Sequence, residues 1–168
     1  MLKNYFDSYK LPIIIARFSN FYGPGQPIYR LIPKVIACID NKIQFSIEGD
    51  GKSKRNFLFT EDFCRAILCL IKMGKPGQTY HFSGNKFFSI SGMVQLICNL
   101  KKVNFKKLVK ISKDRIGKDD AYKLNSFQTK KKLNWCTKVG IKEGLIKTII
   151  FYDQMFKKLK KEPTIFKL

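Results

Sequence analysis

The stretch from Gly49 to Asp62 combines a tight turn, a cluster of cations, a strand and a helix start. Gly49-Asp50-Gly51 is a turn signal, since glycine adopts positive φ angles without steric cost. Lys52, Lys54 and Arg55 bring positive charge to this turn. We single out Arg55, because a guanidinium holds a phosphate through two parallel hydrogen bonds, whereas an ammonium offers only a point charge. The stretch therefore predicts an anion site, with an ordinary basic loop between two strands as the alternative.

The elements around this stretch alternate between helix and strand. Residues 56–59 are expected to form a short strand, and Thr60 is expected to cap a helix with acidic residues in its first turn. Residues 13–16 form a continuous apolar run, typical of a strand buried on both faces of a parallel sheet. The loop 17–25 then follows at the carboxyl end of that strand, where open α/β sheets bind ligands. The helix that begins at Thr60 is expected to extend to residue 73. Further helices are predicted at 1–9, 30–41, 89–100, 125–134 and 141–160, and further strands at 43–47, 79–82 and 108–111. This order predicts an α/β fold.

The net charge of +21, from 33 basic and 12 acidic residues, raises nucleic-acid binding as an alternative function. Of the basic residues, however, only 5 are arginine, and the lysines are scattered over every segment. That distribution indicates a lysine-biased surface, so we do not expect a nucleic acid as the specific partner.

The five cysteines form no C-x-x-C pair and are odd in number. We predict that they are buried thiols in a reducing compartment. The single histidine, His81, has no Cys or His at ligand spacing, so we expect no metal site. No apolar run approaches the roughly 20 residues of a membrane span, and the first residues lack a signal-peptide core. These observations favour a soluble cytoplasmic protein with no membrane contact.

Six motifs follow one another in an order and at a spacing that is typical of one family. They are LPIIIARFSNFYGPG (11–25), RLIPKVI (30–36), GDGKSKRNFLFTEDFCRA (49–66), GKPGQTYHFSG (74–84), DRIGKDDAY (114–122) and LNW (133–135). From about residue 9 to 152 the chain resembles the carboxyl-terminal half of an extended short-chain dehydrogenase/reductase of the NAD-dependent epimerase/dehydratase family. Within it, the dTDP-glucose 4,6-dehydratase-like nucleotide-sugar dehydratases are the most similar group. The resemblance implies one unit over residues 1–168, in which the end of a Rossmann-like parallel sheet is interleaved with a small α/β substrate-binding domain.

The resemblance also implies roles for particular residues. Phe18 and Ser19 would lie against the nicotinamide of NAD, and Asn20 would hold the pyrophosphate of a nucleotide-sugar substrate. The other substrate-binding residues implied are Arg30, Leu31, Arg55, His81, Arg115 and Tyr122. Three of the five arginines thus fall in loops assigned to a diphosphate, which agrees with the bidentate geometry of the guanidinium.

Three positions depart from the pattern of the family. Ala121 stands where an arginine is usual, His81 where an asparagine is common, and Asn56 where an aspartate follows the motif arginine. For His81, a packed residue at a strand end is an equally good interpretation. The departures leave the base, the sugar and the choice between dehydration and epimerisation open.

The catalytic and cofactor motifs of the family are missing from this chain. None of the seven tyrosines has a lysine four residues later, and no glycine-rich dinucleotide loop is present. We therefore expect no catalytic residue here, and we expect a missing amino-terminal half or a homologous subunit to supply most of the NAD site. A stand-alone nucleotide-sugar-binding module and a basic nucleic-acid-binding protein are the alternatives.

Overall fold

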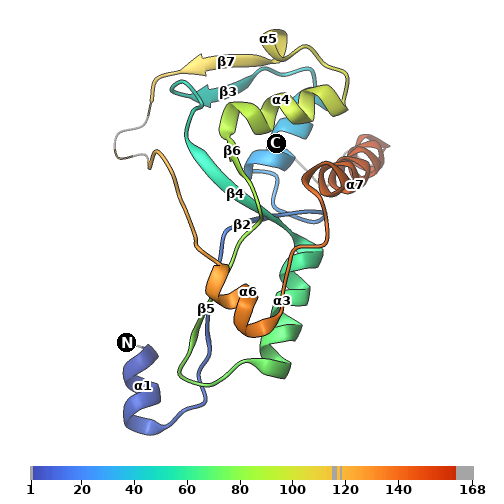
Figure 1. The fold of residues 1–168 in the computed structure, drawn as a ribbon. Coiled ribbons are helices and arrows are strands. Elements are labelled where there is room, and N and C mark those ends of the chain that lie inside the picture. The colour runs from blue at the N-terminus through green and yellow to red at the C-terminus, as the bar shows by residue number, and fades with distance from the viewer. Residues whose placement is uncertain (1, 115–116, 118, 162–168) are drawn as a thin grey trace.

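The computed structural model describes residues 2–114, 117 and 119–161, which form a mixed α/β structure (Figure 1). Its helices are α1 (Leu2–Tyr9), α2 (Leu31–Asp40), α3 (Thr60–Met73), α4 (Ile90–Leu100), α5 (Phe105–Leu108), α6 (Phe127–Leu133) and α7 (Ile141–Lys161). Its strands are β1 (Ile15–Phe18), β2 (Asn20–Tyr22), β3 (Phe45–Glu48), β4 (Lys54–Phe59), β5 (Thr79–Phe82), β6 (Phe87–Ser89) and β7 (Val109–Ser112). The predicted α/β fold class is confirmed.

The strands form three small sheets. β1 pairs in parallel with β5, with Ile15 opposite Thr79 and Phe18 opposite Phe82. β4 lies between β2, which is parallel to it, and β6, which is antiparallel. β3 and β7 form a second parallel pair. Three of the four pairings are parallel, as expected for strands that alternate with helices.

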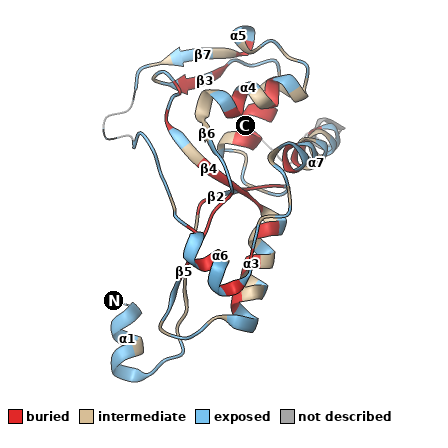
Figure 2. Ribbon diagram, viewed as in Figure 1, coloured by how far each residue is buried: buried red, intermediate tan, exposed pale blue. Residues whose placement is uncertain are grey.

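Two hydrophobic cores lie at the two ends of the elongated molecule (Figure 2). The upper core joins α2, α4 and α7 to β3 and β4, and its fully buried residues include Val35, Met93 and Leu145. The lower core joins β5, α3 and α6, and it includes Ala66, Phe82 and Trp135. We call these two parts the upper and lower lobes. α1 projects from the lower lobe and buries none of its residues.

The strand β4 contributes to both cores. Phe57 and Phe59 belong to the upper core, whereas Leu58 belongs to the lower one. Successive side chains of a strand point to opposite faces, so three consecutive residues serve two cores. The same strand therefore holds the two lobes together.

The predicted boundaries needed several corrections. Helix α3 begins at Thr60 with Phe59 in the capping position, so the predicted cap at Thr60 is wrong, although Glu61 and Asp62 do lie in the first turn. Strand β1 begins two residues later than predicted. The short strands β2 and β6 were not predicted. Gly49 and Gly51 have φ angles of 64° and 67°, which confirms the predicted turn.

The prediction that all five cysteines are buried is wrong. Cys98 is buried, and this burial raises the pKa of its thiol. Cys64 and Cys136 are exposed, because each lies on the solvent side of its segment. All five are free thiols. Among the helices of the described part of the chain, none is long and apolar enough to cross a membrane.

Candidate functional site

A cavity of about 530 Å³ lies where β1 and β2 meet the start of α2. Five residues that the sequence predicted as binding residues line it, namely Phe18, Ser19, Asn20, Arg30 and Leu31. The other lining residues are Phe21, Tyr22, Gln26, Pro27, Ile32 and Phe57. The fold thus brings the two predicted segments 18–20 and 30–31 together at one cavity.

The first wall of the cavity is fixed by the junction between β1 and β2. Ser19 is buried, its N–H donates to the Phe82 carbonyl oxygen at 2.9 Å, and its hydroxyl donates to Asn56 Oδ1 at 3.2 Å. The ring of Phe18 stacks on that of Phe82, with centroids 5.1 Å apart. Asn20, by contrast, is exposed at the cavity. Its amide is therefore the group on this wall that is best placed to contact a ligand.

The second wall is the amino-terminal end of α2. Arg30 precedes the first helical residue in an extended conformation, and its guanidinium lies over the Tyr29 ring, 5.4 Å from the centroid. Leu31 begins the helix. The first backbone N–H groups of a helix have no acceptor within the helix and carry partial positive charge, which favours anions. Arg30 and these N–H groups make this wall electropositive.

A second predicted group, Arg55 and Tyr122, meets at the start of β4. The Arg55 guanidinium donates to the carbonyl oxygens of Lys54 and Asp119, both at 2.9 Å. The Lys54 backbone N–H donates to Asp120 O at 2.8 Å and its carbonyl accepts from Tyr122 N at 3.2 Å. Residues 119–122 therefore run along β4, and the Tyr122 side chain remains 46% exposed. Among the described residues, acceptors engage two of the five N–H groups of Arg55, and the other three have no acceptor there.

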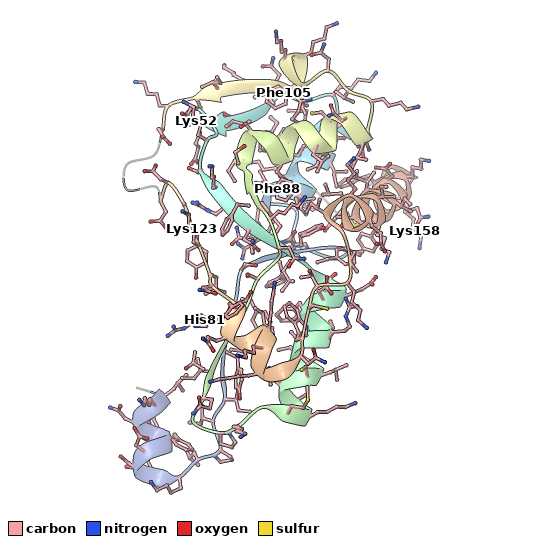
Figure 3. The ribbon with its side chains drawn as sticks, viewed as in Figure 1. Lys52, His81, Phe88, Phe105, Lys123 and Lys158 are labelled. Atoms are coloured by element: carbon pink, nitrogen blue, oxygen red, sulfur yellow. The ribbon has the colours of Figure 1, made fainter. Side chains whose placement is uncertain are left out.

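Among the described residues, three predicted ones, Arg55, Tyr122 and His81, do not line the cavity. His81 lies in the lower lobe (Figure 3), with its ring Nε2 3.4 Å from Arg17 Nη1 and its backbone N–H donating to Thr129 Oγ1 at 2.8 Å. It does not line the cavity described above. Arg115 lies outside the described residues.

Gln26 is a residue of the cavity that the sequence reasoning missed. Its side-chain NH₂ donates to Phe21 O at 2.8 Å, and its backbone carbonyl oxygen accepts a hydrogen bond from the Tyr152 hydroxyl. Burial raises the pKa of Tyr152 to about 12. Gln26 directly follows the predicted ligand loop 17–25. Its contact with α7 joins residues 126 positions apart and leaves no local signal.

The residues that line this cavity are polar, basic or apolar, and none of them is acidic or a histidine. No cluster of three His, Cys, Asp or Glu that could hold a metal occurs in the described part of the chain. Only the nicotinamide end of NAD fits the residues of this chain. The packed Phe18 ring and the Ser19 backbone provide a wall for a flat ring, whereas the sequence contains no glycine-rich turn for the pyrophosphate.

Known proteins resemble this chain in both sequence and structure. A model of the NAD dependent epimerase/dehydratase family matches residues 1–82. Human dTDP-D-glucose 4,6-dehydratase is 35% identical over 160 residues, which cover 92% of this chain and 45% of the human protein. The Escherichia coli dTDP-glucose 4,6-dehydratase is 31% identical over 156 residues, which cover 86% of this chain and 43% of that protein. The chain thus spans about half the length of the curated relatives that it matches.

Solved structures of dTDP-glucose 4,6-dehydratases also resemble this chain. DesIV, a dTDP-glucose 4,6-dehydratase from Streptomyces venezuelae solved with NAD bound, superposes with a TM-score of 0.87 at 26% identity, covering 90% of this chain and 47% of that one. The dTDP-glucose 4,6-dehydratase of Bacillus anthracis, in complex with NAD, has a TM-score of 0.87 at 29% identity, covering 95% and 50%.

Proposed function

Because the chain belongs to the NAD-dependent epimerase/dehydratase family, whose cofactor is NAD, we propose that it is the substrate-binding half of a nucleotide-sugar 4,6-dehydratase. The observation that carries this proposal is the cavity at which Asn20, Arg30 and the start of α2 meet. The relatives named above are dTDP-glucose dehydratases, so dehydration is the reaction that we favour over epimerisation.

The diphosphate of the substrate is the group that suits this cavity. The amide of Asn20 can donate to a phosphate oxygen, and Arg30, which also lines the cavity, adds a cation. The first backbone N–H groups of α2, which directly follow Arg30, add further donors. The apolar remainder of the lining then suits the less polar faces of a base or sugar ring.

Arg55 and Tyr122 form the second part of the proposed site. Residues 119–122 are tied to β4 by backbone hydrogen bonds, and the three unused N–H groups of Arg55 can receive a phosphate beside them. Arg115 and His81 remain proposed substrate contacts on the basis of the family motifs alone.

The reaction itself requires groups from elsewhere. The resemblance implies oxidation of the sugar at C4, loss of water across C5 and C6, and return of the hydride, with NAD supplying the redox chemistry when bound. A general base is needed for the first step, and this chain has no Tyr-x-x-x-Lys pair to provide it. We assign the base and most of the NAD site to an amino-terminal half or a homologous subunit.

The edge of β1 is the place where such a partner would join. Ile15 and Ser19 direct their N–H groups toward β5, so the alternate residues Ala16 and Phe18 direct theirs to the opposite side, where the described residues contain no further strand. An unpaired edge accepts another strand through main-chain hydrogen bonds. The exposed side chains of Leu2, Tyr5 and Tyr9 on α1 add apolar surface nearby.

We also propose a cytoplasmic location for the protein. The five cysteines are all free thiols, and free thiols persist in a reducing compartment.

Calorimetric titration of the 168-residue chain with dTDP-glucose tests the proposed function. We expect the chain to bind dTDP-glucose and dTDP and not to bind thymidine, because the diphosphate is the group that the cavity holds. Equal binding of thymidine, or no binding of either diphosphate, would contradict the proposal. A nucleic-acid-binding protein would instead bind oligonucleotides with a steep salt dependence and show no preference for the sugar nucleotide.

A further inference from the structure

A second cavity, of about 400 Å³, lies on the lower lobe beside the start of α6. Its lining comes from three parts of the chain: Asn56 on β4, residues 83–85 and 87 around the start of β6, and residues 123–127 and 130. No residue lines both this cavity and the one described above. Ser19 lines the first cavity and Asn56 lines the second, so the hydrogen bond between these two residues lies at the boundary between the cavities.

The polar side chains at the rim of this cavity present donors. Lys130 Nζ donates to Asn85 Oδ1 at 2.8 Å, and the Phe127 backbone N–H donates to Asn125 Oδ1 at 2.9 Å. Each amide oxygen is thus engaged by a donor of the chain, which fixes the orientation of both amides. The two NH₂ groups of Asn85 and Asn125 are left without an acceptor among the described residues.

The charged side chains that line this cavity are all positive. Lys123 and Lys130 both line it, and none of its lining residues is acidic. Lys123 lies in the segment between β7 and α6 (Figure 3) and is exposed. Two ammonium groups and two amide NH₂ groups therefore line a space whose lining includes no acidic side chain, and such a donor set suits a phosphate.

Two aromatic rings complete the cavity. Phe87 and Phe127 both line it and remain 44% and 65% exposed. An exposed ring beside cations is suited to stacking on a nucleobase. The volume falls within the usual range for small-ligand sites.

We propose that this second cavity binds a nucleoside phosphate, with the phosphate at Lys123, Lys130, Asn85 and Asn125 and the base against Phe87 or Phe127. The site is independent of the proposed dehydratase function, since it shares no lining residue with the substrate cavity. The ligand is either a free mononucleotide or the nucleotide unit of a single strand, and both have this chemistry.

Nuclear magnetic resonance of the 168-residue chain, titrated with uridine 5′-monophosphate at low ionic strength, provides the test. The side-chain NH₂ signals of Asn85 and Asn125 report on this cavity alone. We expect both to shift with the nucleotide and not with uridine. Unchanged signals would overturn the proposal.

Variants locate the two parts of the ligand. The double variant Lys123→Gln/Lys130→Gln is expected to weaken binding by about tenfold or more, since two charged contacts are lost. Lys131→Gln, which changes an exposed lysine of the same helix outside the cavity, is the matched control and should bind as the wild type does. Phe127→Ala should weaken binding of the nucleotide and leave that of inorganic phosphate unchanged. Equal affinities of the double variant and the control would also overturn the proposal.

A uridine tetranucleotide distinguishes the two sources of the ligand. Binding at least tenfold tighter than that of the monophosphate, with the same signals shifted, supports a single strand. Equal affinity supports a free nucleotide.

Discussion

The guanidinium of Arg55 donates a 2.9 Å hydrogen bond to the carbonyl oxygen of Asp119, which lies 64 residues further along the chain. This contact holds the segment 119–122 against β4 and leaves part of the guanidinium available. One residue therefore has two tasks, to position a loop and to receive a phosphate.

Arg55→Lys should weaken the binding of dTDP-glucose by about tenfold, because an ammonium cannot hold Asp119 and a phosphate in the same fork geometry. The neighbouring change Lys54→Arg is the control and should leave affinity within about twofold, since only the backbone groups of Lys54 contact residues 119–122. Calorimetric titration measures both variants. Equal effects of the two changes would refute the bidentate assignment of Arg55.

Asn20→Ala should lower the affinity for dTDP-glucose by about fivefold to tenfold and leave the stability within about 0.5 kcal/mol, because the side chain is exposed at the cavity. Titration and urea unfolding measure the two quantities. Asn41→Ala is the matched control, which should lower the stability and leave the affinity for dTDP-glucose unchanged. The Asn41 amide donates to Ala37 O at 2.9 Å at the far end of α2. A large loss of stability in Asn20→Ala would mark Asn20 as a structural residue.

Asp62→Asn should reduce the free energy of unfolding by about 3 kcal/mol. The Asp62 carboxylate is fully buried, pairs with Arg65 and accepts the backbone N–H groups of Lys138 and Val139 at 2.8 and 3.1 Å. An amide would turn an NH₂ group toward one of these donors and remove the charge that pairs with Arg65. Urea unfolding measures the loss.

Glu61→Gln is the matched control for this change. Glu61 is the preceding residue of α3 and pairs with Lys147 at the surface, where a lost ion pair costs about 0.5 kcal/mol or less. If both variants lost the same stability, the burial of Asp62 would not be the cause.

The stability should depend on pH through Tyr152. Burial raises the pKa of this hydroxyl from 10.0 to about 12, so the folded chain retains a proton that the unfolded chain loses. Stability is therefore lost as the pH rises from 10.0 to about 12. Tyr152→Phe removes this dependence and, at neutral pH, costs about 1 kcal/mol for the hydrogen bond to Gln26. The wild-type protein should therefore lose stability relative to Tyr152→Phe across this range, and a constant difference in unfolding free energy would contradict the assignment.

Much of the fold was predictable because its helices have clear apolar faces. In α4, for example, Met93, Val94 and Ile97 recur at helical spacing and are all fully buried, and Ser89 caps the helix by accepting a hydrogen bond from Gly92 N at 3.0 Å. The position of the loop after β1 at the cavity was also predictable, since ligands bind at the carboxyl ends of parallel strands.

The remainder depends on contacts between distant parts of the chain. β2 and β6 have three residues each, too few for a periodic signal, and both exist because β4 lies between them. The engagement of Arg55 by Asp119 and of Gln26 by Tyr152 follows from the docking of separate segments. Sequence motifs therefore located the loops of the candidate site, and tertiary packing determined which of their side chains remain available.

The sharing of β4 between two cores has a mechanical consequence. Phe57 and Phe59 are fixed on one side of the strand and Leu58 on the other, so a rotation of one lobe against the other must twist the backbone of these three residues. Such a twist would expose apolar surface in both cores at once. The two lobes should therefore unfold in one cooperative transition, and a ligand that restrains either end of β4 stiffens both.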